Sequence, residues 1–234
     1  DDNNYTTTSF AAFGQLVWNI TDDFSATLGL RFTTEEKDRK GSQVSEGNST
    51  GIDTPDIPPV VGPDVFMDNT RSDSDLSPSF NLRYFFTPEW MTYASVSRGF
   101  KSGGFNQRRE LEGSDGEFDE EIATNYEIGW KGATSDRRLQ FNGTFYYVKY
   151  DDFQSQTFDG STLKVTNAGE MKSYGSELEL IFVPLANMVV SSAIGYNKAE
   201  YEEFDNAQCT IEQQVYQYYI DNAPGTLFPG ASVC

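Results

Sequence analysis

The sequence predicts an all-β protein, an antiparallel segment of a transmembrane β-barrel with about eight strands. Apolar and polar residues alternate with a period of two in several long stretches, which indicates strands and not helices. The connections between these stretches alternate between short and long, as in barrels with tight turns at one rim and long loops at the other. The three tryptophans, Trp18, Trp90 and Trp130, all lie close to a short connection. They are therefore predicted to form an aromatic girdle at one membrane interface.

The predicted strands differ in how clearly their two faces can be told apart. Residues 24–33 show the clearest alternation, with Phe24, Leu28 and Phe32 on one face. For residues 10–20 and 90–100 the sequence leaves the assignment of the faces open. The strands expected in chain order cover residues 10–20, 24–33, 76–86, 90–100, 122–131, 139–158, 162–183 and 188–204.

Residues 139–183 are predicted to form one very long hairpin. Its arms cover residues 139–158 and 162–183, far more than the roughly five or six residues of an ordinary strand. The Asp159-Gly160 pair at the tip supplies the positive φ that a tight turn requires. A bilayer crossing uses only about ten residues of each arm. The remainder is expected to project beyond the membrane as a rigid hairpin.

Three long polar segments, residues 39–71, 101–121 and 205–234, are predicted to be extracellular loops. The short turns between the other strands would then be periplasmic. With this polarity both ends of the chain lie outside the cell, whereas a complete barrel normally has both ends in the periplasm. Residues 1–234 are therefore expected to be an interior fragment of a larger barrel domain.

The composition argues against several classes of function. The chain has 17 Lys and Arg against 36 Asp and Glu, a net charge of −19, which argues against nucleic acid as a partner because phosphate contacts need cations. It has no histidine, so metal sites, triads and acid–base chemistry based on histidine are closed off. A run of about eighteen apolar residues is missing, so no transmembrane helix is expected. We expect neither an enzyme nor a bound cofactor.

Two groups of acidic residues are interpreted as ordinary polarity. Glu177 and Glu179 share one strand face, where paired carboxylates line a wall far more often than they catalyse. The second group carries oxygen ligands that suit Ca²⁺ but shows no recognised ligand spacing, so no metal site is predicted. Its members are Asp73, Asp75, Asp115, Asp119 and Glu120.

A basic and aromatic group at the end of the 90–100 strand is the candidate substrate site. Cations beside aromatic rings suit an anionic ligand. As an alternative, the basic side chains pair with the acidic loops or with lipopolysaccharide phosphates. The nearby glycines Gly99, Gly103 and Gly104 are expected to give backbone freedom where the strand leaves the membrane. The candidate residues are Arg98, Phe100, Lys101, Phe105, Asn106, Arg108 and Arg109.

The two cysteines, Cys209 and Cys234, both lie in the last polar segment. An even number of cysteines in one loop suggests a disulfide and an oxidising compartment. Free thiols are the alternative, and the sequence by itself leaves both open.

Several of these stretches resemble one known family in their order and spacing. Residues 93–106, YASVSRGFKSGGFN, closely resemble a signature strand and loop of TonB-dependent outer-membrane receptors. The agreement continues in residues 120–131, 145–154 and 167–179. Altogether the resemblance spans roughly residues 10–204.

The resemblance implies a fold, a location and a function. The parent protein would be a 22-stranded barrel that is occluded by a plug domain and lies in the outer membrane of a Gram-negative bacterium. Such receptors import scarce solutes, most often ferric siderophores, with energy from the TonB–ExbB–ExbD complex acting through the plug. Outer-membrane lipid and lipopolysaccharide would surround the barrel. Cys209 and Cys234 resemble the disulfide that clips an extracellular loop in many members.

Two other functions stay open at this point. The first is a passive porin-like channel, which the presence of a plug upstream would exclude. The second is a secreted β-sandwich that binds glycans on its aromatic rings. A sandwich folds alone in water, whereas a barrel segment needs detergent and aggregates through its open edges.

Overall fold

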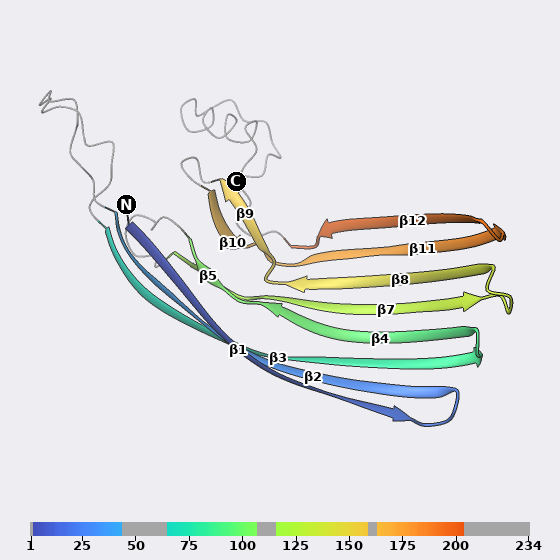
Figure 1. Cartoon of the computed structure of the whole chain (residues 1–234). Helices are drawn as coiled ribbons and strands as arrows, with labels where there is room; N and C mark the ends of the chain where they lie inside the picture. The colour runs from blue at the N-terminus through green and yellow to red at the C-terminus, as the bar shows by residue number, and fades with distance from the viewer. Residues whose placement is uncertain (1, 44–64, 107–115, 159–162, 204–234) are drawn as a thin grey trace, which may run out of the picture.

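The computed structural model describes residues 2–43, 65–106, 116–158 and 163–203, and every regular element in these ranges is a β-strand. Eight long strands form one antiparallel sheet in the order β1-β2-β3-β4-β7-β8-β11-β12, and two short hairpins, β5–β6 and β9–β10, form sheets of their own (Figure 1). The predicted all-β fold with about eight main strands is confirmed. Within these ranges no helix has the length and apolarity to cross a bilayer. The strands are β1 (Asp2–Asn19), β2 (Phe24–Gln43), β3 (Val65–Thr87), β4 (Trp90–Lys101), β5 (Gly104–Phe105), β6 (Glu117–Phe118), β7 (Glu121–Ala133), β8 (Leu139–Asp151), β9 (Gln154–Phe158), β10 (Leu163–Asn167), β11 (Met171–Leu185) and β12 (Met188–Tyr201).

Tight turns join the long strands at one end of the sheet (Figure 1). In the turn between β1 and β2, the hydroxyl of Thr21 accepts a hydrogen bond from the Phe24 N–H at 3.0 Å. In the turn between β7 and β8, the hydroxyl of Thr134 accepts one from the Leu139 N–H at 3.1 Å, and Arg137 has a φ of 54°. Such bonds from side-chain oxygens to the backbone are typical of tight turns. The four predicted short connections are all present.

Cross-strand pairing places apolar residues of neighbouring strands on one face of the sheet. Leu28 of β2 pairs with Leu16 of β1 and with Phe80 of β3, and Tyr126 of β7 pairs with Val96 of β4. Directly paired residues point to the same side, so they define what we call the apolar face. The residues between them define the polar face. The faces of β1 and β4, which the sequence leaves open, are thereby assigned.

The described residues enclose almost no hydrophobic core. Only Met67 and Ala168 are buried hydrophobic residues in the described part of the chain, while side chains of the apolar face such as Leu28, at 55% exposure, stay uncovered. A β-sandwich packs such a face against a second sheet at about 10 Å. The sheet has no such partner among the described strands, which argues against the sandwich alternative. The solvent that fits this face is lipid.

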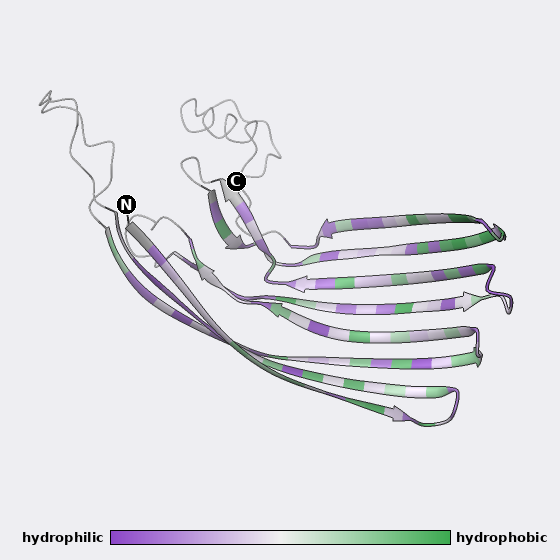
Figure 2. Ribbon diagram, in the orientation of Figure 1, coloured by the Kyte–Doolittle hydropathy of each residue, from purple (hydrophilic) through white to green (hydrophobic). Residues whose placement is uncertain are grey.

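In β2 and β3 the residues of the apolar face are concentrated in the part of each strand nearest the tight turns, where the hydropathy colours are mostly green and white (Figure 2). In β2 the apolar stretch covers residues 24–32 and in β3 it covers residues 76–86. Both match the roughly nine to eleven residues of a transmembrane strand. Beyond this apolar band, the same face of β2 carries Glu36, Asp38 and Lys40. The outer parts of β2 and β3 therefore project into water.

The predicted loop of residues 39–71 has the wrong boundaries. The β2–β3 ladder continues without a break from Phe24↔Tyr84 to Gln43↔Val65, so residues 39–43 and 65–71 are strand. In β1, too, the strand starts at Asp2 and not at residue 10. Apart from Phe66 and Met67, these outer parts are mostly polar on both faces, which removes the alternation that marks a half-buried strand.

The predicted long hairpin exists, but its arms are not continuous. β8 pairs with β11, whereas β9 pairs with β10 in a separate sheet. The two parts are separated by Asp152, with a φ of 54°, on one arm and by Gly169, with a φ of 84°, on the other. Positive φ values at both points redirect the chain. The predicted Asp159-Gly160 tip lies outside the described residues.

Candidate functional site

The polar face of β2 and β3 carries a cluster of charged side chains just beyond the apolar band. Lys37 and Arg71 are direct partners across the two strands, and Glu35 and Asp73 are partners in the next row of that face. The β5–β6 hairpin lies against these side chains. It leaves only 13% of the Arg71 side chain and 5% of the Asp73 side chain exposed.

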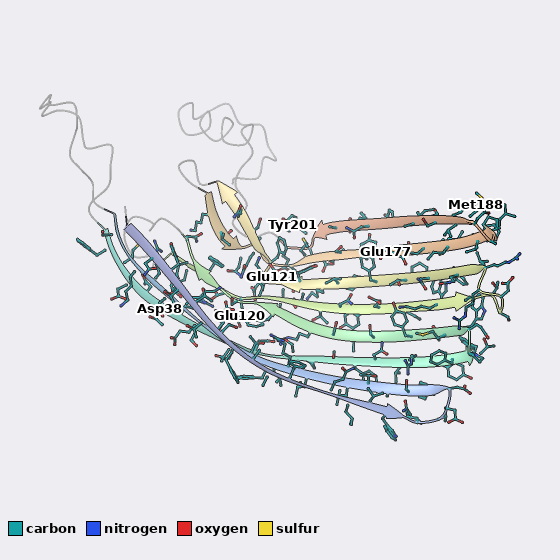
Figure 3. The ribbon with its side chains drawn as sticks, viewed as in Figure 1. Asp38, Glu120, Glu121, Glu177, Met188 and Tyr201 are labelled. Carbon is teal, nitrogen blue, oxygen red and sulfur yellow. The ribbon has the colours of Figure 1, made fainter. Side chains whose placement is uncertain are left out.

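Arg71 is the centre of this cluster. Its guanidinium donates from Nε to both carboxylate oxygens of Asp73 at 3.0 Å. On the side of the β5–β6 hairpin it lies 3.3 Å from Glu117, 3.2 Å from Asp119 and 3.7 Å from Glu120. Figure 3 shows Glu120 and Glu121 where β7 begins. One cation therefore joins a carboxylate of β3 to carboxylates from the connection between β4 and β7.

Lys37 makes a second attachment to the same connection. Its Nζ donates to the Ser102 hydroxyl at 2.7 Å and to the Gly103 carbonyl at 2.6 Å. It also lies 3.1 Å from the Glu35 carboxylate, which accepts a hydrogen bond from the Ser102 hydroxyl. The connection is thus tied to both β2 and β3.

The contacts within the cluster shift the pKa values of several of its charged side chains. The hydrogen bond from Ser102 lowers the pKa of Glu35 below its ordinary value, against the opposing effect of burial. Burial raises the pKa of Glu120, and the nearby Asp73 raises it further. The hydrogen bond to Asp73 raises the pKa of Arg71, so this side chain stays charged.

Gly103 and Gly104 of the connection are needed for close contact and not for unusual backbone angles. A Cβ atom on Gly103 would lie 2.4 Å from the Phe118 carbonyl oxygen and 2.5 Å from Nε of Arg71. On Gly104 it would lie 2.8 Å from the Phe118 ring, whereas nothing lies within 4 Å of such an atom on Gly99. At Gly103 and Gly104 the structure therefore shows close packing of the hairpin in place of the predicted need for backbone freedom. Close approach of another backbone or side chain is the second role of glycine in strands.

The structure gives most described members of the predicted substrate group a protein partner. Arg98 pairs with the Asp75 carboxylate and donates to the Leu76 carbonyl at 2.9 Å. Lys101 lies 4.0 Å from Glu121. These pairs agree with the alternative that the basic side chains neutralise acidic ones.

The aromatic and amide members of that group lie nearby. Phe100 and Phe105 are half-buried, and Asn106 is buried, with both ends of its side-chain amide bonded to the backbone of Val165. Arg108 and Arg109 lie outside the described residues. Contact between this group and a substrate stays a prediction.

The acidic group that suits Ca²⁺ is divided between two arginines. Asp73, Asp119 and Glu120 surround Arg71, whereas Asp75 pairs with Arg98. Asp115 lies outside the described residues. In the described part of the chain no group of three or more potential ligands is placed to hold a metal ion.

The three tryptophans share the apolar face near the tight turns. Trp90 packs edge-on against Phe141 with ring centroids 4.8 Å apart, and Trp130 packs against Phe145 at 5.4 Å. Trp18 is 64% exposed. Their role at a membrane interface stays a prediction. Cys209 and Cys234, the predicted disulfide, lie outside the described residues.

Hydrogen bonds between side chains run along the polar face of the membrane-spanning strands. Tyr93 donates to Glu127 at 2.5 Å, and Asn142 donates to Glu179 at 3.2 Å. Tyr146 and Ser173 both donate to Asn197, at 3.1 Å and 2.8 Å. The interpretation of Glu179 as wall polarity fits this arrangement.

Sequence reasoning missed the residues that position the β5–β6 hairpin. Arg71 stands at the end of the segment assigned to a loop, whereas Lys37 lies between that segment and the predicted 24–33 strand. Gln154 and Asn167 stand in recognised stretches without an assigned role. One usable signal is present: continuing the β2–β3 register outward from Phe32↔Leu76 brings Lys37 beside Arg71.

Comparison with known proteins identifies relatives along almost the whole chain. Residues 1–230 match the family described as TonB dependent receptor-like, β-barrel. The pesticin receptor of Yersinia enterocolitica is 28% identical over 177 residues, which cover 75% of this chain and 24% of that protein. The pesticin receptor of Yersinia pestis matches equally well. The chain thus spans about a quarter of the length of these curated relatives.

Solved structures of similar fold agree with this match. The ferric yersiniabactin uptake receptor FyuA from Yersinia pestis superposes with a TM-score of 0.67 at 22% identity, covering 85% of this chain and 28% of that one. The ferric-catecholate import receptor Fiu from E. coli K12 gives 0.65 at 19% identity, covering 86% and 29%. The ferripyoverdine receptor of Pseudomonas aeruginosa gives 0.61 at 16% identity, covering 85% and 23%. The sheet, its uncovered apolar face and the match over residues 1–230 lead to one conclusion: this chain belongs to the TonB-dependent receptor β-barrel family of the Gram-negative outer membrane.

Proposed function

We propose that this chain forms part of the wall of an active transporter that imports a ferric siderophore across the outer membrane. The observation that carries the proposal is the sheet itself, with lipid-compatible side chains on one face and hydrogen-bonded polar side chains on the other, in a member of this family. The similar structures named for ferric yersiniabactin, ferric catecholate and ferripyoverdine support the choice of solute.

The polar face would line the path through the barrel. β1 and β12 form the two edges of the sheet. Because backbone groups exposed to hydrocarbon cost several kcal/mol each, we infer that further strands pair with both edges. The energy for import would come from the TonB–ExbB–ExbD complex acting through a plug domain, and lipopolysaccharide would surround the outer rim. We expect no catalytic chemistry in this wall.

The basic and aromatic group at the end of β4 remains the proposed substrate contact. Arg98 and Lys101 already have carboxylate partners. A ligand that uses these cations must therefore replace those carboxylates, which costs part of its binding energy.

The test is iron uptake in cells that carry or lack the gene. Under iron limitation, deletion should abolish uptake of radioactive iron bound to the cognate siderophore, and restoring the gene should recover it. Dissipating the membrane potential should stop uptake in the complemented strain. Uptake that persists after dissipation would favour the passive porin-like channel, and iron uptake unaffected by deletion would contradict the proposed solute.

A further inference from the structure

We propose that the β5–β6 and β9–β10 hairpins, which belong to two different extracellular connections, are cross-linked by three amide side chains and move as one body. Asn106, Gln154 and Asn167 are the positioning residues that join them. The consequence for transport rests on the proposed function, whereas the mechanical coupling does not.

The first cross-link runs from β5 to β10. The side chain of Asn106 donates from Nδ2 to the Val165 carbonyl at 2.9 Å, and its Oδ1 accepts from the Val165 N–H at 2.7 Å. One amide side chain thereby meets both backbone groups of one residue, as a neighbouring strand would. Asn106 is 7% exposed, so water has little access to these bonds.

The second cross-link has the same form and runs in the opposite direction. The Asn167 side chain, at the end of β10, accepts from the Asp119 N–H at 2.8 Å and donates to the Asp119 carbonyl at 3.0 Å. It also donates to the Asp152 carbonyl at 2.8 Å. In each cross-link, an asparagine side chain from one hairpin therefore bonds both backbone groups of one residue in the other hairpin or next to it.

Gln154 adds a third connection at the start of β9. Its Nε2 donates to the Ser102 carbonyl at 3.0 Å and to the Asp119 carbonyl at 2.9 Å. Its backbone N–H donates to the Glu121 carboxylate at 2.8 Å. Both ends of the connection between β4 and β7 are thus bonded to the β9–β10 hairpin.

The joined hairpins are attached to strands far apart in the sheet. On one side, Lys37 and Arg71 hold the β5–β6 hairpin on β2 and β3. On the other side, the Phe153 ring packs against Tyr201 of β12 at 5.8 Å. The Glu170 N–H also donates to the Glu203 carbonyl at 3.1 Å. The joined hairpins are thus anchored at β2 and β3 on one side and at β12 on the other, and a ligand that displaces one hairpin displaces the other.

Hydrogen–deuterium exchange of the native outer-membrane protein tests the coupling with Asn106→Ala. The Val165 amide loses its direct acceptor, so its exchange rises whether or not the hairpins are coupled. The decisive amide is Asp119, which is bonded to Asn167 and not to Asn106. Coupling predicts that its exchange rises on the order of three- to tenfold, the loss expected for one hydrogen bond shared by the whole unit. Faster exchange at Val165 with no change at Asp119 would overturn the proposal.

The reciprocal variant and a matched control complete the test. Asn167→Ala should speed exchange of the Val165 amide, although this amide donates to Asn106 and not to Asn167. Asn142→Ala removes an amide that bonds Glu179 on the same face and should change neither hairpin. If the variants fail to assemble, hydrogen exchange of the wild-type protein at alkaline pH, where exchange reports the opening rate, decides the question. Hairpins that move as one body require equal opening rates at the Asp119 and Val165 amides, and unequal rates contradict the proposal.

Transport separates this proposal from the proposed function. In uptake assays with radioactive iron bound to yersiniabactin, a catecholate siderophore or pyoverdine, whichever the wild-type protein imports, Asn106→Ala and Asn167→Ala should raise the half-saturating concentration by similar factors and leave the maximal rate nearly unchanged. Different factors would show that the hairpins act independently. If the wild-type protein imports no iron complex, the proposed function fails, and the exchange result still decides the coupling.

Discussion

The inner and outer parts of β2 and β3 belong to one ladder but are built for different surroundings. In residues 24–32 and 76–86 the exposed side chains are apolar and the opposite face is polar. In the outer parts both faces are mostly polar, and the covered side chains include the partly buried Arg71 and the buried Asp73. Within the membrane, backbone hydrogen bonds hold neighbouring strands together, and the side chains that face outward are apolar. Beyond the membrane, ion pairs and a docked hairpin cover the inner face.

The difference shows that the same strand geometry tolerates opposite burial patterns. Lipid favours the exposed Leu28, whereas water favours exposed Glu36 on the same face of the same strand. A charged residue should therefore be tolerated at position 36 and be strongly destabilising at position 28.

The largest expected effect comes from a charge in the apolar band. Leu28→Arg places a guanidinium near the middle of residues 24–32 and should destabilise the protein by up to about 4 kcal/mol, because a charge at the bilayer midplane loses its hydration. The urea midpoint of unfolding in lipid vesicles and the fraction assembled in outer membranes measure the effect. Glu36→Arg on the same face is the control and should stay near wild type. Equal effects of both changes would remove the proposed boundary.

The next effect concerns the outer region. Arg71→Met leaves Asp73 buried without its cation and should weaken docking of the β5–β6 hairpin by about 3 kcal/mol. Faster hydrogen exchange in residues 102–106 and 116–121 reports it, while the membrane-spanning strands keep their protection. Lys40→Met, which removes an exposed pair with Asp68 at 3.6 Å, should have little effect. Loss of protection throughout the sheet would mean that the regions are not separable.

Close packing within the membrane region gives a smaller effect. In Gly143→Ala the new methyl group would lie 2.3 Å from the Trp130 indole, so the ring must move. We expect a loss of about 1–3 kcal/mol, read from the urea midpoint together with a shift in tryptophan emission. Gly14→Ala, where nothing lies within 4 Å, is the matched control. A stable Gly143→Ala variant with unchanged emission would contradict this packing.

The smallest effect is a pH dependence of the outer region. The pKa of Glu35 is lowered from 4.5, so its contribution to docking is complete above about pH 4.5 and is lost as the pH falls through the lower folded value. The raised pKa of Glu120 acts in the opposite direction, because its protonation favours the folded state as the pH falls. Each contribution should be below about 1 kcal/mol, since both carboxylates keep contact with water.

Exchange in residues 102–106 between about pH 5 and pH 3, corrected for intrinsic rates, measures the contribution of Glu35. Glu35→Gln should reduce the acid-dependent loss of protection, whereas Glu36→Gln, on the opposite face, should not. An identical pH profile in both variants would exclude Glu35 as the responsible group.

The sequence predicts the membrane region well because lipid and the barrel interior impose opposite polarity on alternate residues. The alternation of residues 24–33 is visible without a structure, and so are the tight turns. The outer parts of β2 and β3 carry no such signal, since one face meets water and the other meets ion pairs and a docked hairpin, so both faces carry mostly polar residues. The breaks at Asp152 and Gly169 depend on local φ values that alternation does not encode.

The candidate site is predicted less completely. The group around Arg98 is recognisable as basic and aromatic, but its partners Asp75 and Glu121 are carboxylates among many in the sequence. Asn106 has a polar side chain that suits a ligand, yet it bonds Val165, which is 59 positions away. The alternation of polar and apolar residues in a single sequence does not indicate which of these distant side chains pair.

The strand order has a consequence for how the sheet assembles. Each long strand pairs with the long strand that precedes it in the chain, so the ladder grows by closing one hairpin after another. Contacts that are local in sequence form quickly, whereas those that close long loops carry a larger entropy cost. The bonds from Lys37 to Ser102 and from Asn106 to Val165 join positions 65 and 59 residues apart. We therefore expect the β5–β6 and β9–β10 hairpins to dock last, after the wall that carries them is complete.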